Sequence, residues 1–295
     1  MANNFVLAKN YIENLDEVYK LASVTSDLTG DQAMVRAGAA ANEIIYPHIS
    51  TSGLGDYSRE TGYPKGAVSI EWKTTKFNYD RGTKITVDVM DDQETFNLAF
   101  GKAGAALQRE KVAPEADAFT FAILAGKAGI MKATPADLAN AEAFLAALLV
   151  AKNALDEAEV PDEERYLFAT PTLVNSLMAL DTTKSKEVYN SFAVVRKVPK
   201  TRFMTAIDLK DGKTTGEELG HYSPATGAKF INFMIVHKPA IIKYDKHVAN
   251  DLIPPNLNAD YDGYILKYRK YGIVDVYENK VNGIYLHASA TDAVM

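Results

Sequence analysis

The stretch from Trp72 to Gly126 changes its hydrophobic period partway along, and this change limits the possible folds more than any other feature of the sequence. Its first part alternates apolar and polar residues, which predicts half-buried antiparallel strands that meet at a turn over Asp80-Arg81-Gly82. From Asp91 onward, apolar residues recur every three to four positions, which predicts a helix. Pro114 interrupts that pattern, so we expect the helix to kink or restart there and to end near Gly126.

Three acidic residues, Asp91, Asp92 and Glu94, stand at the predicted start of this helix. Neighbouring carboxylates can serve as an acid and base pair, because one raises the pKa of the other. Carboxylates at a helix start also complement the positive end of the helix dipole. We favour this second interpretation, because nothing else in the sequence marks the region as catalytic.

The composition is that of an ordinary globular protein, with 295 residues, 47% hydrophobic and 24% charged. No apolar run approaches the roughly 18 to 20 residues that cross a membrane, and the N-terminal sequence does not have the pattern of a secretory signal. We therefore expect synthesis and function in a cytoplasm. The absence of cysteine excludes disulfides and thiolate-based sites, and a net charge of −6 argues against tight nucleic-acid binding.

The segment between Thr51 and Ala67 contains four glycines and one proline, which is typical of a long projecting loop. Strand-like residues flank it on both sides, so the loop is expected to form the tip of a two-stranded ribbon. A ribbon of two strands is marginally stable alone in water. It therefore needs a neighbour to lie on.

The rest of the chain alternates between helical and strand patterns, which predicts an α+β fold. Helices are expected at Asn10–Leu21 and after two cap signals, Thr134-Pro135 and Thr170-Pro171. A polar stretch over 208–228 is expected to be a surface loop. Strands are expected at Arg165–Ala169, Phe230–Val236, Ala240–Tyr244, Tyr264–Val276 and Val281–Leu286.

Motifs of enzymes and cofactor sites are missing from the sequence. Gly53-Leu54-Gly55 begins like a dinucleotide fingerprint, but Ser58 takes the place of the third glycine and no strand-to-helix pattern surrounds it. The five histidines show no short metal-binding spacing. We predict no catalytic residue, no cofactor and no metal site.

Several short motifs, none of them catalytic, follow one another along the chain. They are Gly53-Leu54 with Asp56-Tyr57, Tyr79-Asp80-Arg81-Gly82 with Val87-Asp88, Asp92 to Thr95, Arg109, Val112 with Pro114-Glu115-Ala116-Asp117-Ala118, Phe168-Ala169-Thr170-Pro171, and Asp262-Gly263-Tyr264. In order and spacing the chain resembles the major capsid proteins of tailed phages, which have the Hong Kong 97 fold. The resemblance covers nearly the whole length.

This resemblance implies an α+β, Hong Kong 97-type fold with an N-terminal arm, an extended E-loop, a peripheral domain with a long spine helix, and an axial domain. In this family the E-loop lies over an adjacent subunit, which would supply the neighbour that the ribbon needs. The implied division is arm 1–43, E-loop ribbon 44–89, peripheral domain with spine helix 90–132, axial domain 133–259, return strands of the peripheral domain 260–278, and C-terminal strand and tail 279–295.

The resemblance also implies a structural protein without catalytic turnover. Its copies would assemble as pentamers and hexamers into an icosahedral shell around phage double-stranded DNA, in the cytoplasm of a bacterial host. Scaffold and portal proteins would be partners, contact with DNA would be weak, and no membrane would be involved. Candidate contacts between subunits are Tyr57, Arg59, Glu60, Tyr63, Lys65, Trp72 and Arg81.

Two alternatives to a phage head stay open. The first is an encapsulin-like shell of the same fold that encloses protein cargo. The second is a cytoplasmic α+β enzyme or binding protein of a type that the motifs do not identify.

Overall fold

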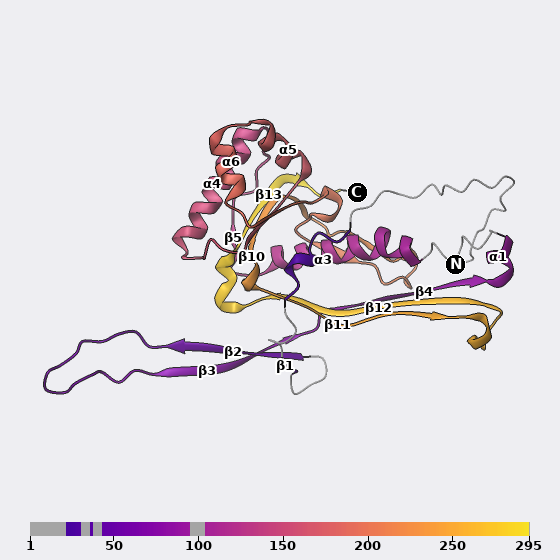
Figure 1. Cartoon of the computed structure of the whole chain (residues 1–295), viewed down its shortest axis with the longest axis horizontal. Coiled ribbons are helices and arrows are strands. Elements are labelled where there is room, and N and C mark those ends of the chain that lie inside the picture. The colour runs from indigo at the N-terminus through magenta and orange to yellow at the C-terminus, as the bar shows by residue number, and fades with distance from the viewer. Residues whose placement is uncertain (1–21, 31–35, 38–42, 95–103, 295) are drawn as a thin grey trace.

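The computed structural model describes residues 22–30, 36–37, 43–94 and 104–294 (Figure 1). The predicted helix Asn10–Leu21 and most of the expected N-terminal arm lie outside these residues. The described chain forms a long ribbon, a helix beside a three-stranded sheet, and a second sheet packed against further helices. This mixture of helices and strands confirms the predicted α+β class.

The predicted ribbon is formed by strands β2 (Glu43–Thr51) and β3 (Val68–Lys76), which pair antiparallel along their whole length. A short strand, β1 (Arg36–Ala37), pairs with β2 near its start. The ribbon extends away from the body, and the loop over residues 52–67 forms its tip (Figure 1).

Strand β4 (Tyr79–Asp88) runs straight through Asp80-Arg81-Gly82, so the turn predicted there is wrong. β4 pairs antiparallel with β12 (Gly263–Val276), and β12 pairs in turn with β11 (Ile241–Ile253). Gly82 lies so close to β12 that an added Cβ would stand 2.8 Å from the carbonyl oxygen of Tyr268. The glycine permits a close approach of two strands rather than a turn.

The helical half of the opening feature begins with α1 (Val89–Glu94), which carries Asp91 and Asp92 in its first turn. From Gly104, where the described chain continues, helical residues lead into a π-helical turn (Gln108–Val112) and then into α3 (Ala113–Gly126). In the π-turn the amide of Ala113 donates to the carbonyl of Gln108, five residues back. The irregularity predicted at Pro114 is thus a π-turn just before the proline, and the helix ends at Gly126 as expected.

The second sheet has the strand order β5-β13-β10-β6-β7 and is buried on both faces. One face packs on α3, where the rings of Phe121 and Phe168 lie 5.3 Å apart. The other face packs on further helices, where the rings of Phe144 and Phe233 lie 5.6 Å apart. The strands are β5 (Met131–Lys132), β6 (Arg165–Ala169), β7 (Val194–Lys197), β10 (Lys229–His237) and β13 (Ile284–Asp292). The helices on the second face are α4 (Ala141–Glu157), α5 (Pro171–Ala179) and α6 (Thr183–Asn190).

The helix predicted to open at Thr134-Pro135 begins later, at Ala141, because Asn140 is its cap. The Asn140 side chain accepts a 2.8 Å hydrogen bond from the amide of Ala143. The amides of Ala133 and Ala136 instead donate to carbonyls of β13, which holds this segment alongside the sheet. Cap chemistry at Thr134 is therefore overridden by pairing with a distant strand.

Three smaller predictions also need correction. The polar stretch 208–228 includes a strand pair, β8 (Ile207–Leu209) with β9 (Tyr222–Pro224). β11 reaches Ile253, well past the predicted end at Tyr244. The last strand starts at Ile284 because residues 278–283 form a 3₁₀-helix.

A buried carboxylate on α3 holds the N-terminal segment to the body. Asp117 is fully buried and accepts hydrogen bonds from the backbone or hydroxyls of residues 23–25 at 2.7–3.1 Å. It also pairs with the buried guanidinium of Arg202 at 3.0 Å. The ammonium of Lys243 on β11 completes the cluster by donating to the carbonyl and hydroxyl oxygens of Thr25, both at 2.7 Å.

Lys243 makes the free energy of unfolding depend on pH. Burial lowers the pKa of Lys243 from 10.5 to about 8, although the charge of Asp117 opposes this. Between these two values the unfolded chain binds a proton that the folded chain has lost, so stability should rise with pH by at most about 1.4 kcal/mol per unit. The free energy of unfolding, measured with urea at pH 7, 8, 9 and 9.5, should stay level up to about pH 8 and then rise.

The substitution Lys243→Met should abolish the rise, whereas the exposed Lys267→Met should retain it. The measurement stops at pH 9.5 because buried tyrosines such as Tyr222, whose pKa is raised to about 12, give the opposite trend above pH 10. A wild-type curve that stays level from pH 8 to 9.5 would contradict the prediction.

Candidate functional site

One face of the ribbon carries apolar side chains that nothing in the described chain covers. Ile49, Val68, Ile70 and Trp72 are 57–68% exposed. The strand register places Ile49 opposite Ile70 and Pro47 opposite Trp72, so these side chains form a stripe along one face. Contiguous exposed apolar side chains of this kind mark an interaction surface.

The base of the ribbon is fixed to the body through its other face. Ile44 and Tyr46 are buried against Ile242 and Ile273 of the sheet β11-β12-β4. The ring of Tyr46 meets the ring of Tyr277 edge to face at 5.0 Å. The ribbon is therefore anchored at one end and presents its apolar stripe beyond the anchor.

The tip loop has an ordered local structure of its own. Ser58 and Gly62 exchange two backbone hydrogen bonds, and the Ser58 hydroxyl accepts from the amides of Glu60 and Thr61. The rings of Tyr57 and Tyr63 pack edge to face at 4.9 Å although the two residues are 60% and 86% exposed. Such a loop offers a preformed surface.

Five of the predicted contact residues lie in the tip loop between β2 and β3, namely Tyr57, Arg59, Glu60, Tyr63 and Lys65. Trp72 lies on β3, within the apolar stripe. Arg81 lies apart from both, on the side of β4 that faces the helix. Whether any of these residues contacts another subunit stays a prediction.

Arg81 forms a bidentate ion pair inside the subunit. Its Nε and Nη2 donate to Oε1 and Oε2 of Glu115 at 2.7 and 3.2 Å, and Nη2 also reaches the carbonyl of His221 at 3.3 Å. The Tyr79 hydroxyl donates to the same carboxylate at 3.2 Å. Burial alone would raise the pKa of Glu115, but neighbouring His221, Arg81 and Tyr79 outweigh it and lower that pKa.

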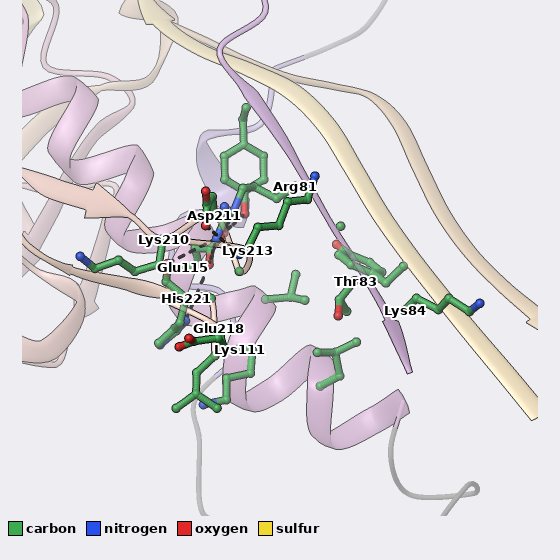
Figure 2. Close-up of a pocket in the computed structure, with 18 residues that line it drawn as sticks. Arg81, Thr83, Lys84, Lys111, Glu115, Lys210, Asp211, Lys213, Glu218 and His221 are labelled. Atoms are coloured by element: carbon green, nitrogen blue, oxygen red, sulfur yellow. Dashed lines mark hydrogen bonds and ion pairs between the residues drawn. The ribbon is translucent and has the colours of Figure 1, made fainter. Parts of the chain in front are cut away.

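This ion pair forms one wall of a pocket of about 500 Å³ between β4, the π-turn and the segment 210–221 that joins β8 to β9 (Figure 2). The Nδ1 atom of His221 is buried at its edge, 3.7 Å from Glu115 and without a hydrogen bond to the described residues. Four lysines also line the pocket, Lys84, Lys111, Lys210 and Lys213. We call this surface the cationic pocket.

No pattern in the sequence indicates the cationic pocket. Its walls come from β4, the π-turn and the segment 210–221, which are far apart in the chain and carry no short motif. The positive φ of 72° at His221, a non-glycine residue, is also invisible before the backbone is known. Pairing of Arg81 with Glu115 could have been suspected only from the geometry of the fold.

The described residues contain neither a membrane-spanning helix nor a metal-binding cluster. No helix there is long and apolar enough to cross a membrane. No group of three or more histidine, aspartate or glutamate side chains in that part of the chain is arranged to hold a metal ion.

Breaking the Arg81 pair should destabilise the subunit. The substitution Arg81→Met leaves the Glu115 carboxylate buried without its main partner, which should lower the free energy of unfolding by about 3 kcal/mol. Arg59→Met, at the exposed tip, should change it by less than about 0.5 kcal/mol. Urea unfolding of both variants provides the measurement, and equal values for the two would refute the structural role of Arg81.

Comparison with known proteins finds similarity in structure but not in sequence. No protein-family model and no curated protein matches the chain. A structure from Mycobacterium phage Che8 superposes with a TM-score of 0.60 and 14% identity, over 97% of this chain and 98% of that one. The capsid structure of Cyanophage P-SCSP1u superposes with a TM-score of 0.62 and 14% identity, over 97% of this chain and 94% of that one.

The mature capsid of bacteriophage PhiM1 gives a TM-score of 0.60 at 12% identity, over 98% of this chain and 93% of that one. Each of these matches spans more than nine tenths of both chains. The protein therefore has the fold of tailed-phage major capsid proteins.

Proposed function

We propose that the protein is the major subunit of an icosahedral phage head, assembling from pentamers and hexamers of this chain around double-stranded DNA. The single observation that carries the proposal is the uncovered apolar stripe of Ile49, Val68, Ile70 and Trp72 on a projecting ribbon. Such a stripe does not stabilise an isolated subunit, because its apolar side chains stay in contact with water. Burial against a neighbouring copy would stabilise the assembly by about 1.5–3 kcal/mol for each fully covered side chain.

The role is structural rather than catalytic. Copies of the same chain are its main partners, with scaffold and portal proteins as further partners during head assembly in a bacterial cytoplasm. Contact with packaged DNA is weak, because the net charge of −6 supplies no dense cationic surface to hold phosphate. Weak contact lets DNA enter and leave the shell.

The family's domain names can be applied to this chain as part of the proposal. The β2–β3 ribbon is the E-loop, and α3 with the helical residues before it is the spine helix. The peripheral domain takes the sheet β11-β12-β4, because a boundary at residue 259 would separate the paired strands β11 and β12. The axial domain takes helices α4 to α6 and the second sheet, including the last strand, β13.

Expression of the chain, alone and together with a candidate scaffold protein, tests the proposal. Size-exclusion chromatography and negative-stain microscopy should show closed particles with subunits in five- and six-fold groups. Particles that contain a cargo protein would point to the encapsulin-like alternative. A monomer or dimer under every assembly condition would reject a shell of either kind.

The ribbon provides a sharper prediction. Deleting residues 52–65 should leave the subunit folded but prevent closed shells. The double variant Ile70→Ser with Trp72→Ser should act in the same way, because it removes the centre of the apolar stripe without touching the anchored base. Circular dichroism would show whether each variant is folded, and particle counts from negative-stain micrographs would give the yield of closed shells.

A matched control lies on the opposite face of the same strands, where His48 stands across from Glu71. Replacing both with serine alters as many side chains of the ribbon but leaves the stripe intact. This control should assemble as the wild type does. Normal particle yield from the deletion variant would show that the ribbon does not hold subunits together.

A further inference from the structure

The last two residues of α4 and the turn that leads to β6, together residues 156–164, carry six acidic residues, and we call this segment the acidic turn. It lies at the C-terminal end of α4, where the helix dipole is negative and the last turn contains no basic residue. Glu159 has a φ of 56°, in the left-handed region that favours glycine. Negative charge and a side chain at this position both work against the stability of the subunit.

Only part of this charge is balanced inside the chain. The buried Arg165 pairs with Asp156 at 2.6 Å and with Asp162 at 2.9 Å. Glu157, Glu159 and Glu163 are exposed, and none forms an ion pair with the described residues. Residues that destabilise their own subunit and form no compensating contact within it are expected to serve a function.

The cationic pocket offers the complementary charge. Arg81 neutralises Glu115, while the Asp211 carboxylate accepts from the amides of Lys213 and Thr214 at 2.7 and 2.8 Å. The Glu218 carboxylate accepts from the amide of Gly216 at 3.0 Å. The acids of the pocket are thus engaged by groups of their own subunit, whereas Lys111 and Lys213 are exposed.

The pocket also presents an apolar contact, because Leu219 at its edge is 85% exposed. The acidic turn carries the exposed Pro161 between its carboxylates. Exposed carboxylates around an apolar residue thus match, in charge and polarity, a pocket lined by lysines and a leucine.

The two surfaces lie on opposite flanks of the body. In Figure 1, α4 stands on the left of the body, above the projecting ribbon, and β4 with the described first part of the interrupted helix extends to the right. Two different, complementary surfaces on opposite flanks produce a head-to-tail contact between copies. Such a contact is heterologous, and it forms a ring when the rotation closes.

We propose that the acidic turn of one copy docks in the cationic pocket of the next copy around a ring of subunits. This inference rests on the proposed shell function and adds to it the contact between neighbours within a ring. It is separate from the ribbon, whose contact is apolar. Because the charged side chains are exposed, the contact should weaken as ionic strength rises.

Charge reversal on each side, and then on both, tests the contact in the full chain. The pocket variant is Lys111→Glu with Lys213→Glu, and the turn variant is Glu159→Lys with Glu163→Lys. Each should reduce the yield of closed particles by about tenfold or more, because like charges then face each other. A chain that carries all four substitutions restores opposite charges at every contact and should recover most of the wild-type yield.

The outcomes separate this inference from the proposed function. If the wild type forms no particles, both fail together. If the wild type assembles and either two-site variant assembles equally well, the docking contact is wrong and the shell function stands. Loss in both variants without recovery in the four-site chain also overturns the contact, as does loss from the pocket variant alone, which would indicate a different anionic partner.

One substitution distinguishes docking from misfolding. Glu159→Gly removes the backbone strain and one negative charge at the end of α4, so it should raise the Tm by about 2–4 °C. The docking contact loses a carboxylate, so particle yield should fall although the subunit is more stable. A rise in both stability and yield would contradict the inference.

Discussion

Two carboxylates on α3, Glu115 and Asp117, hold the separate parts of this subunit to one helix. Asp117 binds residues 23–25 of the N-terminal segment and the guanidinium of Arg202. Glu115 binds Tyr79 and Arg81 of β4. A buried ion pair contributes little net stability because desolvation opposes the attraction, but an unpaired partner is costly. These contacts therefore serve to select one arrangement of the segments around α3.

That arrangement matters because the ribbon and the pocket both depend on it. The ribbon continues into β4, and β4 is fixed to α3 through Arg81 and Glu115. The same pair reaches the carbonyl of His221 and so positions the segment 210–221. A rigid centre lets the projecting parts present defined surfaces, although few contacts within the subunit support those parts.

The sequence predicted the features that depend on local pattern. Alternation and glycine content predicted the ribbon, and Pro114 predicted an irregularity that proved to be a π-turn. The errors arose where a distant strand overrides local chemistry. Gly82 looked like a turn because its close approach to Tyr268 cannot be seen from the sequence, and Thr134-Pro135 looked like a cap although nearby amides bond to β13. The ion pair between Arg81 and Glu115 could not be predicted either, because the two residues are far apart in the sequence and meet only in the fold.

In the proposed shell, the two outward surfaces would have different tasks, because they differ in chemistry. Burial of the apolar stripe is favourable without depending strongly on orientation, so the stripe would bring copies together. The charges of the proposed docking contact would attract over about a Debye length and favour one orientation, so they would select the correct neighbour. A weak contact of this kind can break when a copy is misplaced, whereas a closed shell would repeat it many times. On this proposal, the uncovered acidic turn and apolar stripe lower the stability of the single subunit in favour of the assembly.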